Sequence, residues 1–260
     1  MLDASGYVVA RREATVSSKL TAKVVAVLIE EGRRVEQDQV IAQLDDSNAR
    51  AQLAVFAARR DQALAALDAA VIDFANVSTT FARDEALHAQ RMISAQSFDE
   101  AKARYDAARA RMEVARQTVK VAEADVALAE RNLADTVVRA PFAGVVTVKA
   151  AQEGEMVSPV SGGGGFTRTG IGTIVDMESL EVEVDVSESF IERVHAGQDV
   201  AVKLNAYPDW QIAGRVLAII PTADRAKATV TVRIALDEKD ERVVPEMGVR
   251  VSFLSERAQQ

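Results

Sequence analysis

Residues that commonly carry out catalysis are sparse in this chain of 260 residues. Its two histidines, His88 and His195, lie far apart and in no spacing that is typical of metal ligands, so we expect both to be exposed to solvent. Cysteine is absent, which excludes disulfides and thiolate metal sites. A nucleophile would have to be Ser, Thr or Lys beside a base, and the sequence contains no nucleophile elbow.

Pairs of carboxylates are present, but they lie where local structure accounts for them. Glu30-Glu31 precedes a predicted turn, and Asp45-Asp46 precedes a predicted helix, of which Asp46 or Ser47 is expected to be the N-cap. Acidic residues at such positions stabilise turns and helix ends without doing chemistry.

A glycine run at residues 161–165 lacks the Gly-Lys-Ser/Thr that would follow in a phosphate-binding loop, and we expect a flexible loop there. Trp210 follows Pro208 closely, and packing in a β-structure accounts for it better than a ligand site. We therefore predict that the protein is not an enzyme and that it has no cofactor and no metal site.

Charge and hydrophobicity narrow the classes of protein to which the chain can belong. The net charge of −8 argues against a nucleic-acid-binding protein, which would present a basic face. No run of about 18 apolar residues exists, so no membrane-spanning segment is expected. Residues 1–6 lack the basic and apolar regions of a signal peptide, and both ends adjoin predicted strands. We expect the chain to be a piece of a longer protein.

The longest regular pattern covers residues 46–135, which contain neither proline nor glycine and divide near Met92. In the second half, larger residues alternate with alanine in an unbroken three–four spacing, which predicts the seam of a coiled coil. The first half carries a matching but interrupted stripe, with Arg60 and Ser78 as the interruptions. The seam residues are Phe98, Ala101, Tyr105, Ala108, Met112, Ala115, Val119, Ala122, Val126, Ala129 and Leu133 in the second half, and Leu53, Leu64, Leu67, Val71, Phe74 and Phe81 in the first.

This pattern predicts two helices joined by a short turn, in an antiparallel hairpin about 60 Å long at 1.5 Å per residue. The chain has no other strong helical pattern that could complete a bundle. Because a projecting hairpin has little core of its own, we expect it to pack against copies of itself or against another protein.

Short β-branched runs lie on both sides of the hairpin, and the two sets resemble each other. Segments 24–35 and 145–157 each contain Val-Val-x-Val, an acidic residue before a glycine, and a valine three positions after that glycine. Two such half-motifs predict a small β-sandwich into which the hairpin is inserted. Alternating runs that include Leu180–Val186 and Thr229–Leu236 predict a small antiparallel β-barrel, with one short helix at Glu188–Val194.

The expected fold is thus α+β, multidomain and elongated. Residues 1–45 and 136–165 are assigned to the split sandwich, 46–135 to the hairpin and 166–256 to the barrel.

Several short motifs recur in the same order as in a known family. They are Leu133-x-Asp-Thr-x-Val-x-Ala-Pro-Phe-x-Gly-Val145, Gly154-x-x-Val157, the strand Leu180–Val186 followed by Glu188, Gly197-Gln198, Gly214-x-Val216 with Pro221, and Pro245-Glu-Met-Gly248.

In the order and spacing of these motifs the whole chain resembles the periplasmic adaptor proteins, also called membrane fusion proteins, of the HlyD and RND-adaptor superfamily. The resemblance implies that the sandwich is of the lipoyl type. It also implies a membrane-proximal domain, for which too few residues remain here, so we expect that domain to be missing.

The resemblance extends to the turn of the hairpin. Members that dock on TolC-type outer-membrane channels carry an arginine, a leucine four residues later and a serine seven residues after that. Arg83, Leu87 and Ser94 fit this spacing. Arg83 and Leu87 lie one turn apart on one helix face, and Ser94 is placed to cap the second helix.

The resemblance implies a non-enzymatic adaptor of a Gram-negative tripartite efflux pump. Such a protein links an inner-membrane transporter, of the RND class or of an ABC (MacB-like) class, to a TolC-type channel. It also implies that copies assemble into a ring, a hexamer, and that the full-length protein lies in the periplasm with an inner-membrane anchor.

Two alternatives remain open at this stage. One is a type I secretion adaptor that exports a protein. The other is a lipoyl- or biotin-type carrier of a multienzyme complex, which needs a modifiable lysine at the turn between the half-motifs. The hairpin occupies that place, and Lys19, Lys23 and Lys149 lie in predicted β segments instead.

Overall fold

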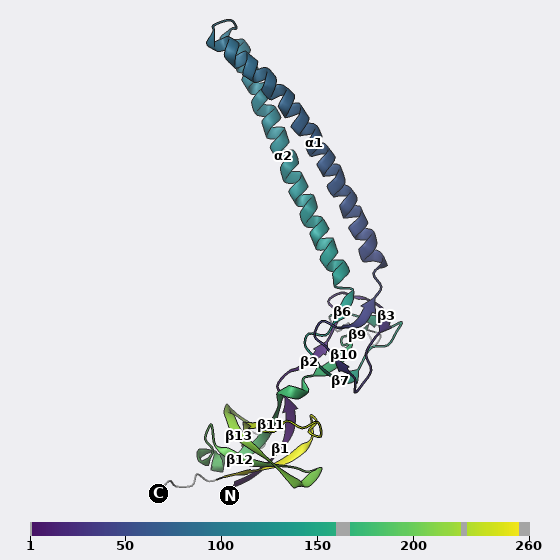
Figure 1. Ribbon diagram of the computed structural model, residues 1–260, viewed down its shortest axis with the longest axis vertical. Helices are drawn as coiled ribbons and strands as arrows, with labels where there is room; N and C mark the ends of the chain where they lie inside the picture. The colour runs from purple at the N-terminus through teal and green to yellow at the C-terminus, as the bar shows by residue number, and fades with distance from the viewer. Residues whose placement is uncertain (1, 160–166, 225–227, 255–260) are drawn as a thin grey trace. The chain divides into compact units, whose positions relative to one another are not determined.

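The structure is a computed structural model that describes residues 2–159, 167–224 and 228–254 (Figure 1). The chain divides into two compact units. One comprises Met1–Ser18, Ala26–Ala42 and Val138–Gln260, and the other comprises Lys19–Val25 and Gln43–Val137. The predicted glycine loop at 161–165 lies outside the described residues.

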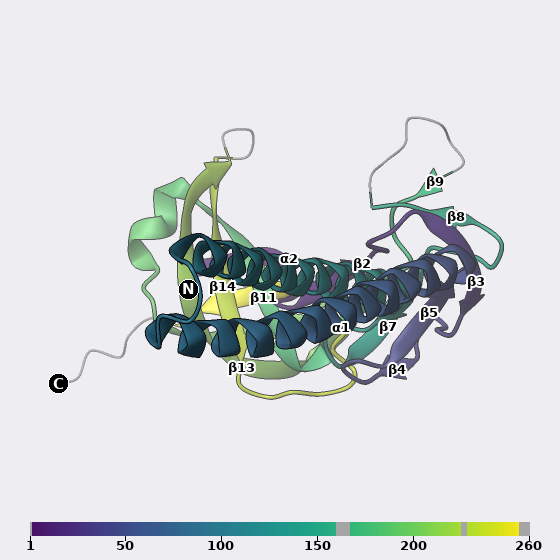
Figure 2. The same cartoon turned by 90° about the horizontal axis from the view of Figure 1, so that it is seen from above.

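The predicted hairpin is confirmed. Helix α1 (Ser47–Ala89) and helix α2 (Ala95–Ala134) run side by side in both views of the chain (Figures 1 and 2). At their base, Lys19 Nζ binds Asp135 at 2.6 Å. Asp46 is the N-cap residue of α1, but its carboxylate binds Arg50 at 2.7 Å instead of capping a backbone amide.

Six strands form a closed barrel, which confirms the predicted barrel. Their order around the barrel is β1 (Leu2–Ala10), β11 (Leu180–Ser187), β14 (Thr229–Leu236), β13 (Tyr207–Asp224), β12 (Asp199–Leu204) and β15 (Gly248–Phe253). The short helix predicted at Glu188–Val194 is a 3₁₀ helix, η2 (Glu188–Arg193), and another, η1 (Met177–Ser179), precedes β11.

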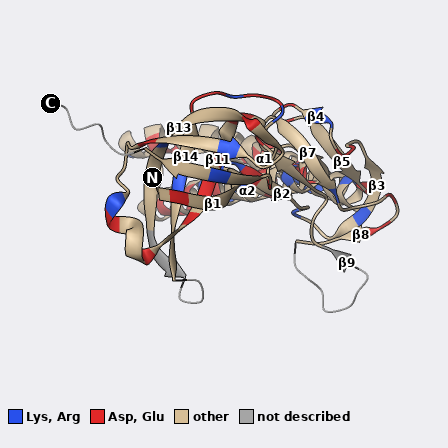
Figure 3. Cartoon of the chain, turned by 90° about the horizontal axis from the view of Figure 1, so that it is seen from below, with Lys and Arg blue, Asp and Glu red and all other residues tan. Residues whose placement is uncertain are grey.

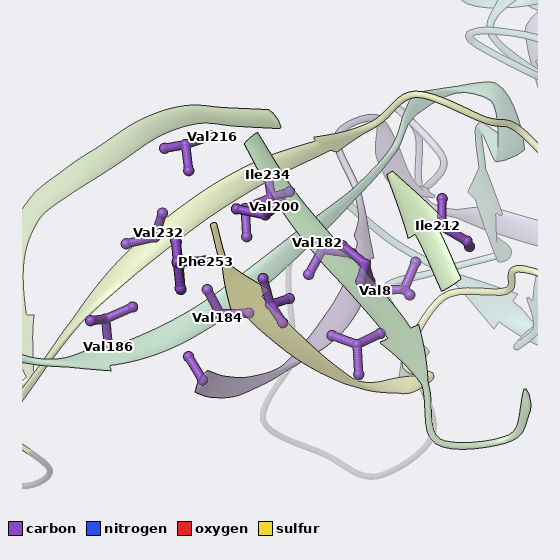
Figure 4. Close-up of a cluster of buried hydrophobic side chains, with 14 of the residues drawn as sticks. Val8, Val182, Val184, Val186, Val200, Ile212, Val216, Val232, Ile234 and Phe253 are labelled. Carbon is purple, nitrogen blue, oxygen red and sulfur yellow. The ribbon is translucent and has the colours of Figure 1, made fainter. Parts of the chain in front are cut away.

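Strict alternation along the strands builds the barrel core. Val182, Val184 and Val186 of β11 are buried with Val232 and Ile234 of β14 (Figure 4). Successive side chains of a strand point to opposite faces, so the intervening residues face outward. Figure 3 shows charged residues of both signs on these strands, and Arg233 lies 3.5 Å from Glu181 and 3.6 Å from Glu183.

Two segments join different sheets from those expected. Residues 1–10 were assigned to the sandwich, yet β1 pairs with β11 and with β15 and closes the barrel. Conversely, β10 (Gly172–Val175) was assigned to the barrel and pairs with β2 (Glu13–Val16) and β7 (Gly144–Lys149). Alternation predicts that a segment is a strand, but it does not indicate which sheet that strand joins.

The remaining strands form two further sheets. The four-stranded sheet has the order β2, β10, β7 and β4 (Arg34–Val35). The five-stranded sheet has the order β6 (Val137–Arg139), β5 (Val40–Leu44), β3 (Ala22–Val27), β8 (Met156–Val157) and β9 (Thr167–Arg168).

The two half-motifs of the sequence take matching conformations in these sheets. Gly32 and Gly154 both have positive φ angles, 79° and 89°, which glycine adopts without strain. Each is followed by a two-residue strand whose valine, Val35 or Val157, is buried. The internal repeat seen in the sequence is therefore present in the backbone.

By length and composition alone, α1 is apolar enough to cross a membrane, with a mean hydropathy of 1.2 over its best window. From the sequence we expected no membrane-spanning segment. Two aspartates, Asp68 and Asp73, lie in the apolar part of α1, and Asp73 pairs with Arg111 of α2 at 3.6 Å. Because carboxylates are costly in a bilayer core, this pairing favours a helix that packs on α2 in water.

Candidate docking site at the hairpin tip

The seam between the helices follows the prediction on α2 and departs from it on α1. Every predicted seam residue of α2 is buried or half-buried. On α1, Leu64 and Val71 are 38% and 42% exposed, and Ala63 and Ala70 take their places in the seam. Small side chains permit close approach of two helices, and the prediction gave too much weight to large ones.

With this correction the α1 seam also has an unbroken three–four spacing. Arg60 belongs to it as a half-buried residue, and so do Asp84 and His88 near the turn. The spacing was hidden in the sequence by these polar residues. The α1 seam consists of Leu53, Phe56, Arg60, Ala63, Leu67, Ala70, Phe74, Val77, Phe81, Asp84 and His88.

Towards the turn, the seam becomes a ladder of aromatic rings that alternate between the helices. His88 lies on Phe98 with ring centroids 4.5 Å apart, Phe98 lies 5.8 Å from Phe81, and Phe81 lies 4.8 Å from Tyr105. The ladder continues to Phe74, whose ring centroid lies 5.4 Å from that of Tyr105. Rigid rings at these separations favour a fixed pairing of the two helix ends.

His88 was expected to be exposed, and this expectation is wrong. Its ring is half-buried against Phe98, with 10° between the ring planes, and its Nδ1 atom has no hydrogen-bond partner among the described residues. The imidazole fills a seam position, since His88 follows Asp84 by four residues and Phe81 by seven. His195 is exposed, as expected.

The turn itself is held by backbone and capping hydrogen bonds. Met92 N donates to Leu87 O at 2.9 Å, and Arg91, with a φ of 60°, reverses the chain. Ser94 is the N-cap of α2, and its Oγ accepts from Ser97 N at 3.1 Å, which confirms the capping expected from the sequence.

The three residues singled out by the sequence lie together at this end of the hairpin. Arg83 and Leu87 are exposed one turn apart on α1, and Ser94 begins α2 across the turn. Within the part of the chain that the structure describes, the Arg83 guanidinium has no ion-pair partner. The tip thus presents a free cation beside an apolar side chain.

One further residue of the tip was missed by the sequence analysis. Met92 is 68% exposed, the highest value among the large apolar residues of the described chain. It lies in the turn, outside either helical period, so the seam pattern gave no signal for it. An exposed, flexible thioether beside Leu87 enlarges the apolar part of the tip.

Two other features of the described residues bear on metal binding and on a possible ligand site. No group of three or more His, Cys, Asp or Glu residues in the described ranges could hold a metal ion. A cleft of about 660 Å³ has a charged rim in which Arg12 pairs with Asp176 at 3.5 Å and Arg34 pairs with Glu178 at 3.4 Å. These acids are neutralised by arginines, and the cleft contains no histidine.

The perturbed carboxyl groups also argue against acid catalysis. A hydrogen bond from Lys149 lowers the pKa of Glu30, and Arg242 lowers the pKa of Asp240 to about 2. A general acid at neutral pH needs a raised pKa, so both groups are poor candidates. Trp210, as expected, packs against the barrel core, with the Arg242 guanidinium 4.1 Å above its ring.

Two known protein families match this chain, one over the small sheets and the hairpin and the other over the barrel. Residues 12–161 match a family described as the CzcB-like, barrel-sandwich hybrid domain, and residues 180–257 match the CusB-like, beta-barrel domain. The chain belongs to the periplasmic adaptor, or membrane fusion protein, family. The hairpin of this adaptor lies within the first match and its barrel strands from β11 onward lie within the second.

Individual relatives are more distant. The adaptor is 34% identical over 110 residues to the nodulation protein NolF of Rhizobium meliloti, which is 42% of this chain and 28% of that protein. It is 22% identical over 227 residues to the macrolide export protein MacA of Escherichia coli O157:H7, covering 87% of this chain and 60% of that one. The chain therefore spans less than two thirds of either relative.

Among solved structures, MacA of Actinobacillus actinomycetemcomitans has the same fold. It superposes with a TM-score of 0.84 at 21% identity, over 98% of this chain and 79% of that one. The membrane fusion protein Spr0693 of Streptococcus pneumoniae R6 gives a TM-score of 0.68 at 22% identity, over 98% and 99% of the two chains. At these identities, the likeness concerns the fold.

Proposed function

We propose that this chain is the adaptor subunit of a Gram-negative tripartite efflux pump. In this role it links an inner-membrane transporter, of the RND or the ABC (MacB-like) class, to a TolC-type outer-membrane channel. The observation that carries the proposal is the tip of the hairpin. There an unpaired Arg83 and exposed Leu87 and Met92 lie on a turn held by the Ser94 cap.

A cation and apolar side chains on a rigid tip suit a complementary protein surface rather than a small molecule. Arginine and methionine are enriched at protein interfaces, and arginine often forms the strongest contacts there. The aromatic ladder below the tip supports this role, because it fixes the two helix ends against each other. We assign Arg83, Leu87 and Ser94 to the channel contact.

The rest of the chain is assigned by the same proposal. The two small sheets form a lipoyl-like sandwich, and with the barrel they pack side by side in a ring of copies, a hexamer, that contacts the transporter. The protein lies in the periplasm and is anchored to the inner membrane in its full-length form. Its mechanism is assembly and opening of a conduit, without bond chemistry.

The lysines give less support to the alternative role, a lipoyl- or biotin-type carrier. Lys149, at the end of β7, forms an ion pair with Glu30 at 2.8 Å, and Lys19 forms one with Asp135 at 2.6 Å. A carrier lysine has to reach other enzymes from an exposed turn, whereas these ammonium groups are engaged in ion pairs.

Removal of the tip tests the proposal. In the full-length protein, a short glycine-containing turn replaces residues 79–103, which leaves Ser78 and Arg104 about level on the two helices, as judged from the Asp73–Arg111 pair. We expect the transporter still to co-purify with the shortened adaptor from membranes, and the channel to be lost. The unshortened protein is the control. Retention of the channel by the shortened form would contradict the proposal.

A further inference from the structure

The turn that joins α1 to α2 has the hydrogen bonds of a Schellman motif, in which the chain leaves a helix through one left-handed residue. Met92 N donates to Leu87 O at 2.9 Å, and Arg91 N donates to His88 O at 2.8 Å. With Gln90 as the C-cap of α1, these are the six-to-one and five-to-two hydrogen bonds that define the motif. Arg91 is therefore the left-handed residue, and its φ of 60° agrees with that position.

Arginine is a costly residue at this position. A Cβ atom in the left-handed region comes close to the following carbonyl oxygen, so glycine is the usual residue there. The turn would be more stable with glycine, and backbone strain of this kind points to a function for the side chain. The Arg91 side chain is exposed and has no ion pair or hydrogen bond within the described ranges, so the turn itself does not use it.

The same motif gathers the apolar side chains of the tip. In a Schellman motif the side chains at the positions of Leu87 and Met92 commonly contact each other across the turn. Leu87 is 37% exposed and Met92 is 68% exposed, so together they form one apolar patch that faces solvent. Arg83 lies one helical turn before Leu87, and Arg91 directly precedes Met92. Each end of the patch therefore has an arginine beside it.

Two acidic residues of α1 lie close to Arg83 in sequence, but they face other directions. Asp84 is half-buried in the seam. Glu85 is turned by about 200° around α1 from Arg83, since successive residues of an α-helix turn by about 100°. Neither carboxylate forms an ion pair with Arg83 or Arg91 within the described ranges. Both guanidinium groups are thus left for a partner that carries negative charge.

We propose that Arg91 is a second cation of the docking surface, and that its partner is a carboxylate of the outer-membrane channel beside a socket for Leu87 and Met92. This rests on the proposed function, in which the tip contacts that channel. Arginine pairs strongly with carboxylates, and an apolar patch between two such pairs excludes water from them. The strain at Arg91 is then the cost of holding a cation at this point of the turn.

Replacing Arg91 by glycine separates the stability of the hairpin from its docking. In the full-length adaptor, we expect Arg91→Gly to raise the midpoint of thermal unfolding, followed by helical circular dichroism, because glycine takes the left-handed conformation without strain. The affinity for the purified TolC-type channel in detergent should fall by more than about fivefold, a loss typical of an important interface residue. A residue that only formed the turn would not lose affinity when the turn became more stable.

Two further variants isolate the charge at constant strain. Arg91→Gln and Arg91→Lys both keep a side chain in the left-handed conformation, and only the lysine keeps the cation. We expect Arg91→Gln to weaken channel binding and to make it less dependent on salt, and Arg91→Lys to recover part of the affinity. Arg109→Gln is the matched control, because Arg109 is an exposed arginine of α2 away from the turn and its loss changes the net charge equally. It should bind like the unaltered adaptor.

The remaining outcomes separate this inference from the proposed function. If Arg91→Gly binds the channel as tightly as the unaltered adaptor while Arg83→Asp does not bind, Arg91 lies outside the contact and the proposed function stands. If Arg91→Lys binds no better than Arg91→Gln, or if Arg109→Gln loses as much affinity, no specific cation at Arg91 is recognised and the inference is wrong. If the unaltered adaptor does not bind the channel, the proposed function fails and the inference fails with it.

Discussion

Replacing Arg83 by aspartate should abolish efflux by the assembled pump and leave the adaptor folded. Arg83 is exposed and has no ion-pair partner in the described chain, so its loss removes no contact that stabilises the hairpin. The new carboxylate would adjoin Asp84 and Glu85, so three acidic side chains would follow one another where a cation now precedes two. Breaking a desolvated charge pair at an interface costs about 2–5 kcal/mol, which is roughly a 30-fold loss of affinity or more.

The measurement is the resistance that the full-length protein confers on cells exposed to an exported compound, together with the helical circular dichroism of the purified variant. Lys102→Asp is the matched control, because Lys102 is an exposed cation of α2 outside the predicted contact. We expect the Lys102 variant to retain efflux. Normal efflux by the Arg83 variant would show that the tip assignment is wrong.

Replacing Gly6 by valine should destabilise the barrel more than any other change considered. A Cβ atom at Gly6 would lie 1.9 Å from the backbone oxygen of Glu183 and 2.7 Å from Val184 Cα. These are backbone atoms of β11, which also pairs with β14, so β11 cannot move aside without breaking that second ladder. We expect a loss of more than about 3 kcal/mol in the free energy of unfolding, through separation of β1 from β11.

The single tryptophan allows this change to be followed in the barrel alone, since Trp210 packs against the barrel core and the hairpin has no tryptophan. The fluorescence midpoint of the Gly6 variant should fall, while the helical circular dichroism, which α1 and α2 dominate, is retained. Gly32→Ala is the control. Nothing lies within 4 Å of its Cβ position, and only its φ of 79° opposes the change, at about 1–2 kcal/mol. An unchanged fluorescence midpoint for Gly6→Val would contradict the closure of the barrel by β1.

Periodicity alone predicted the hairpin well. The α2 seam from Phe98 to Leu133 needed no correction, because its larger residues and alanines alternate without a break. On α1 the same rule selected Leu64 and Val71, which are exposed, and passed over Ala63 and Ala70. An exposed apolar stripe cannot be told from the seam by hydrophobicity, and only the position of the partner helix decides which residues are buried.

Contacts between distant segments could not be predicted from local patterns. The sequence of β1 predicts a strand but does not indicate its partner strands. Only the fold shows that β1 pairs with β11 and β15. His88 looked like a polar residue near a turn, and its contact with Phe98 depends on how the two helices are aligned. Ser94 was predictable as a cap because an N-cap is a local interaction, whereas Met92 gave no periodic signal.

The most direct test of docking by the hairpin tip is a cross-link between that tip and the channel. Gln90 ends α1 and is exposed beside the turn, and the chain has no native cysteine, so Gln90→Cys in the full-length anchored protein gives a clean probe. Cysteines are placed in turn at the periplasmic end of the outer-membrane channel, and cells are treated with a short thiol cross-linker. We expect a covalent adaptor–channel product at specific channel positions. Absence of that product, with the adaptor folded and the pump assembled, would contradict tip-to-tip docking.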